Sequence, residues 1–163
     1  MDCKVLVEDY RGGILENIQM GVICGINATG DVIYSVGDEK LMTFLRSAAK
    51  PFQAIPVVQN GVVESFGLTS KEAAVFAASQ RGEVYHIEAL ESILHKTDIS
   101  EDQFFCSPSY PLNEELKAEY HRKKGEKRKL YHNCSGKHSG FLALSKVLGA
   151  SASSSATKPD RNG

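Results

Sequence analysis

The apolar pattern changes from a strand pattern to a helical pattern at Ser47, and no other feature constrains the fold of this chain as strongly. Residues 4–8 read as a short strand, and residues 14–27 are rich in β-branched and apolar side chains. Residues 28–31 predict a hairpin turn, after which residues 32–36 return as a strand. We therefore expect an antiparallel meander followed by helices.

The first expected helix begins at or near Ser47. Pro51 then falls in its first turn, where the missing N–H group costs little. Pro56 would remove a hydrogen bond inside the same helix, so we expect a kink or an end there. The pattern places Phe52, Ile55 and Val58 against a core.

Further helices are expected where capping residues precede apolar residues at helical spacing. Ser70 is the expected N-cap of an alanine-rich helix that ends near Ser79. The other expected helices cover residues 84–96, 113–124 and 136–148. The expected class is α+β, an antiparallel sheet with flanking helices, in one domain over residues 1–149. Residues 150–163, rich in Ser and Ala, are expected to be a disordered tail.

Composition excludes several classes of function. Of the 163 residues, 42% are apolar and 24% charged, which is ordinary for a globular protein, and the net charge of −1 recruits neither nucleic acid nor a membrane surface. The basic run at 122–129 lacks interleaved aromatic residues, so we interpret it as solvated surface. The N-terminus lacks the apolar core of a signal peptide, and a cytoplasmic location is expected. The widely spaced cysteines are expected to be reduced.

Ser47 and Lys50 are the first candidates for chemistry. Three residues apart, they would lie on one face of a helix, and a lysine partly removed from water can act as the base that activates a serine. The alternative is a capping serine followed by a solvent-exposed lysine. Ser79 has a similar alternative, a serine at a helix end. Glu83 and His86 could pair on one helix face.

Cys134, Lys137 and His138 gather a thiol, an amine and an imidazole within five residues, around Gly136, which would let the backbone turn tightly. Cysteine and histidine are ordinary zinc ligands, but a zinc site would need further partners. The alternative is anion binding by backbone N–H groups at the start of the last helix.

Four blocks occur in one order: Arg11-Gly12-Gly13-x-x-Glu16-Asn17, Arg46-Ser47-Ala48-Ala49-Lys50-Pro51, Ala78-Ser79 with Glu83 and His86, and Asn133-Cys134-Ser135-Gly136-Lys137-His138. Together they resemble the Ser–Lys L-asparaginases, the zinc-containing asparaginase II family. The resemblance implies a fold similar to serine β-lactamases and glutaminases. It also implies hydrolysis of L-asparagine to L-aspartate and ammonia, with a homodimer as the expected assembly.

The resemblance also implies roles for individual residues. Ser47 would be the nucleophile with Lys50 as its base, and Ser79 would be the serine of a second Ser–Lys pair. Cys134 and Lys137 would be two zinc ligands. Arg46 and His138 would line the substrate pocket.

Two departures from the family pattern matter. The family usually has a histidine after the position of Ser79, and this chain has Gln80. The resemblance covers about the first half of a typical member, so the lysine partner of Ser79 and a cysteine zinc ligand are expected to be absent. We therefore expect a truncated chain that is weak or inactive alone. The alternatives are a non-catalytic folding or interaction module, and a Ser–Lys amidase for another amide such as glutamine.

Overall fold

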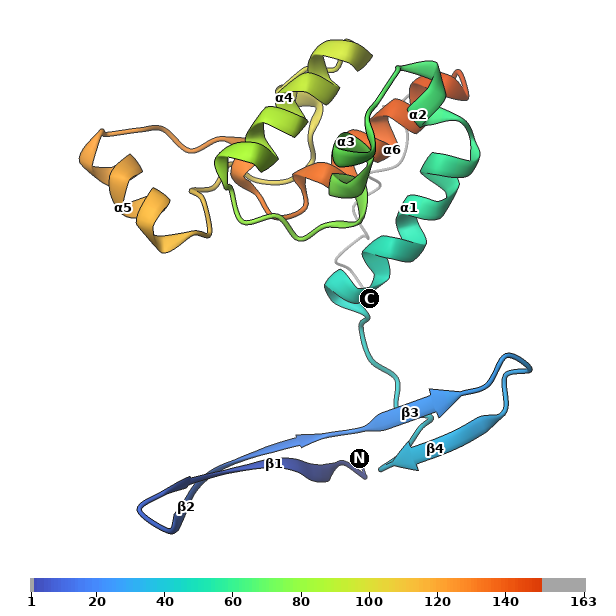
Figure 1. The fold of residues 1–163 in the computed structure, drawn as a ribbon, viewed down its shortest axis with the longest axis vertical. Coiled ribbons are helices and arrows are strands. Elements are labelled where there is room, and N and C mark those ends of the chain that lie inside the picture. Colours follow the sequence, from blue (N-terminus) through green and yellow to red (C-terminus); the bar gives the residue numbers. More distant parts are fainter. Residues whose placement is uncertain (1, 151–163) are drawn as a thin grey trace, which may run out of the picture. The chain divides into compact units, whose positions relative to one another are not determined.

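The computed structural model describes residues 2–150, and the chain divides into two compact units at the junction between Phe44 and Leu45. The strands belong to the first unit and the α-helices to the second (Figure 1). The α+β class is therefore confirmed. The predicted tail lies, apart from Ala150, outside the described residues.

The first unit is built from two antiparallel hairpins. Strand β1 (Lys4–Arg11) pairs with β2 (Ile14–Gly21), and β3 (Ile23–Ile26) pairs with β4 (Val32–Val36). The prediction of one continuous meander is wrong, because β2 and β3 belong to different two-stranded sheets. Only Val22 separates β2 from β3, and a hairpin reversal needs at least two residues.

The turn between β1 and β2 explains the paired glycines near the N-terminus. Gly12 and Gly13 have φ angles of 57° and 81°, in the left-handed region that glycine adopts without steric cost. Arg11 and Glu16 close the hairpin with a 2.7 Å ion pair on its exposed surface. The Arg-Gly-Gly block is thereby explained as hairpin geometry.

The second unit is helical. Its α-helices are α1 (Lys50–Gln59), α2 (Val62–Ser65), α3 (Ser70–Ala74), α4 (Val84–Thr97), α5 (Glu114–Arg122) and α6 (Ser135–Val147). Short 3₁₀ helices cover Arg46–Ala49, Val75–Ala77, Glu101–Gln103 and Lys129–Tyr131. The helices predicted at 84–96, 113–124 and 136–148 are confirmed to within two residues at each end, whereas α2 was not predicted. No helix among the described residues is long and apolar enough to cross a membrane.

Helix α3 begins differently from the prediction. Thr69, not Ser70, is its N-cap: the Thr69 hydroxyl accepts a bond from the Glu72 N–H, and the Glu72 carboxylate accepts one from the Thr69 N–H. This reciprocal capping box satisfies two N–H groups that a helix start leaves unpaired. The helix changes at Val75 into a 3₁₀ turn that ends at Ala77, and Ala78, in extended backbone, separates Ser79 from it.

Helix α1 continues through Pro56 to Gln59, so the prediction that the helix could end at Pro56 is wrong. The face that α1 buries also differs. Phe52 is 69% exposed, while Lys50 and Val57 are buried at 2% and 1%. The buried face of α1 therefore carries a lysine, a residue type that rarely lies in an apolar core.

Helix α6 lies at the centre of the helical core. It packs against α1, α4 and the 3₁₀ turn Val75–Ala77, and buries Leu142 and Ala143. Gly136 permits this packing: a Cβ atom added there would lie 2.0 Å from the backbone oxygen of Val75. Gly136 is helical and has no positive φ, so the expectation of a tight turn at this glycine is wrong. The glycine instead permits close approach of two backbones.

Candidate functional site

Lys50 lies at the centre of the candidate site. Its Nζ donates to the backbone oxygens of Ala78 and Asn133 at 3.1 and 2.9 Å, and to the Ser79 hydroxyl at 2.8 Å. These bonds satisfy the three donors of a lysine ammonium. The prediction that Lys50 is withdrawn from water is confirmed, and the alternative of a solvent-exposed lysine is wrong.

Ser47 lies in the 3₁₀ turn that leads into α1, and its side chain is exposed. Its backbone oxygen accepts a bond from the Lys50 N–H, but its hydroxyl has no hydrogen-bond partner among the described residues. The structure therefore joins Lys50 to Ser79 and does not join it to Ser47. Which serine is the nucleophile stays a prediction.

Ser79 was expected to lack a lysine partner in this chain. The structure supplies one, because Lys50 reaches Ser79 across 29 positions of sequence. The residue Ser79 is itself exposed, so its hydroxyl lies between a buried amine and the surface. Sequence reasoning found both residues but not the contact between them, since helical spacing carries no information about tertiary contacts.

Gln80 is fully withdrawn from solvent, with 1% of its surface exposed. Its Nε2 donates to the backbone oxygens of Leu130 and His132, both at 2.8 Å, and lies 3.1 Å from the Ser135 hydroxyl. Its Oε1 accepts a bond from the Gly82 N–H. Gln80 therefore joins two backbone segments and presents almost no surface to solvent.

The start of α6 places the predicted Cys134, Lys137 and His138 near this cluster. Asn133 supplies an acceptor to Lys50, and Cys134 follows as the N-cap of α6. The Cys134 N–H donates to Nδ1 of His132, and the Ser135 N–H donates to the His132 backbone oxygen. Two N–H groups at this helix start are thus already paired, which weakens the anion-binding alternative.

Two histidines near the lysines have lowered pKa values, which favours their neutral form. Burial lowers the pKa of His132, and the charges of Lys50 and Lys137 lower it further. Burial also lowers the pKa of His138, with Lys137 as the next contributor. Nδ1 of His138 accepts a bond from the Phe105 N–H at 3.3 Å, so His138 has its proton on Nε2.

Zinc is not supported by the donor set near Cys134. The Cys134 thiol donates to the Asn133 side-chain oxygen at 3.5 Å. Over residues 2–150, no group of three or more His, Cys, Asp or Glu side chains lies together as metal ligands would. A protein zinc site needs three or four ligands, so Cys134 and Lys137 alone do not make one.

Arg46 precedes Ser47 in a left-handed backbone conformation, with φ of 52°. This region costs a residue with a Cβ atom about 1–2 kcal/mol. The strain falls at the entry to the helical turn that carries Ser47, and the Arg46 side chain is exposed. Its guanidinium is therefore accessible to an anionic group, which fits the predicted pocket role.

Glu83 and His86 do not pair through their side chains. A carboxylate oxygen of Glu83 accepts a bond from the Asn113 amide at 2.8 Å, which fixes the loop before α5. Nδ1 of His86 is buried without a partner among the described residues, and burial lowers the pKa of His86. The predicted pair is wrong because the carboxylate faces Asn113.

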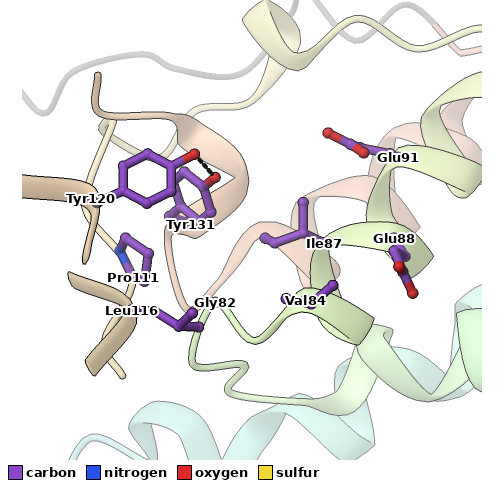
Figure 2. A pocket seen from close by; sticks show the side chains of 9 residues that line it. All are labelled: Gly82, Val84, Ile87, Glu88, Glu91, Pro111, Leu116, Tyr120 and Tyr131. Atoms are coloured by element: carbon purple, nitrogen blue, oxygen red, sulfur yellow. Dashed lines mark hydrogen bonds between the residues drawn. The ribbon is translucent and has the colours of Figure 1, made fainter. Parts of the chain in front are cut away.

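A cavity of about 210 Å³ opens between α4 and α5, shown in Figure 2. Its walls include Ile87 on α4, Leu116 on α5 and the hydrogen-bonded hydroxyls of Tyr120 and Tyr131. Burial and the neighbouring Tyr120 raise the pKa of Tyr131 to about 12. None of the predicted site residues lines this cavity, so it is separate from the cluster around Lys50.

Comparison with protein families gives a match over most of the chain. The family model described as L-asparaginase II matches residues 7–159, a range that contains every candidate residue above and extends past Gly149. No curated protein matches the chain significantly.

Proposed function

This chain belongs to the L-asparaginase II family, and from that premise we propose that it hydrolyses L-asparagine to L-aspartate and ammonia. The observation that carries the proposal is the buried Lys50 amine, 2.8 Å from the Ser79 hydroxyl. A lysine paired with a serine in this way is suited to the activation of a nucleophile.

The contacts of Lys50 define which proton it can accept. The backbone oxygens of Ala78 and Asn133 can only accept hydrogen bonds, so two of the hydrogens on the Lys50 Nζ must point at them. The third position faces the Ser79 hydroxyl. A neutral Lys50 would therefore direct its lone pair at a serine proton, as a general base requires.

We assign the attack to Ser47, whose exposed hydroxyl begins the helical segment that also carries Lys50. The Ser47 oxygen bonds to the side-chain amide carbon as the Ser47 proton passes to neutral Lys50, the C–N bond breaks, and Lys50 returns that proton to the leaving nitrogen, which departs as ammonia. Water then cleaves the aspartyl ester. The contact between Lys50 and Ser79 favours a second assignment, in which Ser79 makes the same ester.

Recognition of the substrate falls to the exposed Arg46 and to His138 in this proposal. The α-carboxylate of asparagine is an anion, and a guanidinium binds carboxylates in a bidentate manner. Zinc, with Cys134 and Lys137 among its ligands, belongs to the proposal only with additional donors, and no step above depends on it.

A non-catalytic interaction role is the second candidate, and exposed apolar side chains of the first unit favour it. Ile14 is 75% exposed and Ile33 is 69% exposed. Exposed apolar surface of this kind marks protein interaction sites. Such a role predicts a folded chain without ammonia release.

Ammonia release from L-asparagine and from L-glutamine tests the proposal. Lys50→Met abolishes release, and the exposed Ser65→Ala in α2 is the matched control that keeps it. Mass spectrometry of acid-quenched samples locates an aspartyl adduct on the peptide of Ser47 or of Ser79, and the corresponding alanine variant removes it. Faster release from L-glutamine would identify a glutaminase. Release that survives Lys50→Met would overturn the proposal.

A further inference from the structure

Gln80 connects the same two backbone segments that Lys50 connects. Lys50 takes its acceptors from Ala78 and Ser79 on one side and from Asn133 on the other. Gln80 directly follows Ser79 in the sequence. Its side chain donates to the carbonyls of Leu130 and His132, which lie just before Asn133. The two side chains therefore form parallel links between residues 78–82 and residues 130–135.

We propose that Gln80 is a positioning residue for the hydrolysis: its amide sets the distance between the two segments, and this distance holds Lys50 against Ser79. The proposal rests on the proposed function only for its catalytic consequence. The structural consequence, the placement of Lys50, is tested without any turnover.

The bonding of Gln80 leaves nothing for a substrate. Its two N–H protons are taken by two carbonyls and shared with the Ser135 hydroxyl, and its oxygen is taken by the Gly82 N–H. With 1% of its surface exposed, the side chain cannot reach a ligand. Gln80 therefore acts through Lys50 and Ser79 and does not touch the reacting atoms.

An amide suits this position for a specific reason. The Leu130 and His132 carbonyls both accept from the Gln80 amide nitrogen, while the Gly82 N–H donates to the amide oxygen. A glutamine amide carries two donors and an acceptor, whereas a neutral histidine carries one donor and one acceptor. Without the Gln80 amide, the Leu130 carbonyl loses its donor, whereas the His132 carbonyl keeps the Ser135 N–H.

Acetylation of lysines by acetic anhydride, followed by peptide mass spectrometry, tests the placement of Lys50. Lys50 is buried and fully bonded, so it reacts slowly in the native protein. In Gln80→Met, we expect Lys50 to react about tenfold faster, the change that loss of one hydrogen bond permits. Gln59→Met at the exposed end of α1 is the matched control and leaves the Lys50 rate unchanged.

Two other lysines serve as internal references. Lys96 donates to the Gly67 oxygen and Lys146 to the Thr97 oxygen, and neither lysine shares a hydrogen-bond partner with Gln80. Their rates stay constant if Gln80 positions Lys50 locally. A common increase at all of them would show general loosening of the fold and would overturn the proposal, as would an unchanged Lys50 rate.

The catalytic consequence is measured on the same samples. Gln80→Met lowers kcat for asparagine and leaves KM unchanged, because Gln80 does not bind substrate. Absence of hydrolysis by the unsubstituted protein would refute the proposed function, while the acetylation rates would still decide the role of Gln80. Should Gln80→Met fail to fold, Gln80→Asn keeps the polarity but shortens the reach by one methylene, and the same Lys50 acceleration is expected.

Discussion

The Nζ atom of Lys50 lies 2.9 Å from the backbone oxygen of Asn133, 83 positions later in the sequence. This contact connects α1 to the segment that begins α6, so two motifs far apart in the chain meet at one amine. The cost of burying that amine is offset by its three hydrogen bonds. The structural role of Lys50 can therefore be measured separately from any catalytic role.

Lys50→Met is expected to destabilise the helical unit. The substitution keeps the length of the side chain but leaves the oxygens of Ala78 and Asn133 without their donor. Relief of the buried charge offsets part of this loss, and we expect a net decrease of about 1–3 kcal/mol in the free energy of unfolding. Urea denaturation measures it, with Lys71→Met at an exposed position of α3 as the control. Equal stability of the two variants would contradict the prediction.

Gly136→Ala is expected to be more destabilising than Gly140→Ala, although both change the same helix. The added Cβ at Gly136 meets the backbone of Val75 at 2.0 Å, while at Gly140 it meets the Phe76 ring at 3.0 Å. A ring can shift by a few tenths of an ångström, but the backbone of a packed turn cannot do so easily. We expect a loss of several kcal/mol, roughly 3 or more, at Gly136 and about 1 at Gly140. Thermal denaturation of both proteins gives the comparison, and the reverse order would refute it.

Arg46→Gly is expected to be more stable than Arg46→Ala. Both variants lose the guanidinium, but only glycine adopts the φ of 52° without steric cost, which favours it by roughly 1 kcal/mol. The same two substitutions at Lys71, within right-handed α3, provide the control, because there alanine is favoured by about 1 kcal/mol. Equilibrium unfolding ranks the glycine and alanine variants by stability at each position. If alanine were the more stable variant at both positions, Arg46 would carry no strain.

The lowered pKa of Glu72 is expected to make the helical unit less stable in acid. Burial raises the pKa of Glu72, but hydrogen bonds from Lys96, Ser92 and Thr69 outweigh burial and hold the pKa at about 2, below the ordinary 4.5. A lowered carboxyl pKa stabilises the fold above pH 4.5, and this stabilisation is lost as the pH falls from 4.5 through 2. Its magnitude is on the order of 3 kcal/mol. In Glu72→Gln, the free energy of unfolding should depend less on pH in that window. The substitution Glu64→Gln, at an exposed position, should leave the pH dependence unchanged.

Local sequence patterns predicted most helices because each carries its own signals. Helix α4 shows apolar residues at helical spacing, and the structure has Asn113 as the N-cap of α5. The start of α3 was assigned to Ser70 because both Thr69 and Ser70 are good caps. Glu72, three residues after Thr69, was the signal that distinguishes them.

The residues of the site could be predicted, but their partners could not. Lys50 and Ser79 were found from short motifs, whereas the oxygens of Ala78 and Asn133 are backbone atoms that every residue type carries. Gln80 was noted only as a departure from the family pattern, and its burial follows from tertiary packing. Gly136 was interpreted as a turn because a glycine signals backbone freedom without saying whether a turn or a close approach needs it.

The separation between Lys50 and Asn133 also has a consequence for the order in which the protein acquires its structure. A contact across that many residues must close a long loop of chain before it gains any bond. Hairpins and helices form from neighbours in microseconds, while contacts between distant segments limit the folding rate. On a ribosome, the amine of Lys50 emerges long before its acceptor on Asn133, so one of its three hydrogen bonds cannot form until the start of α6 has been synthesised.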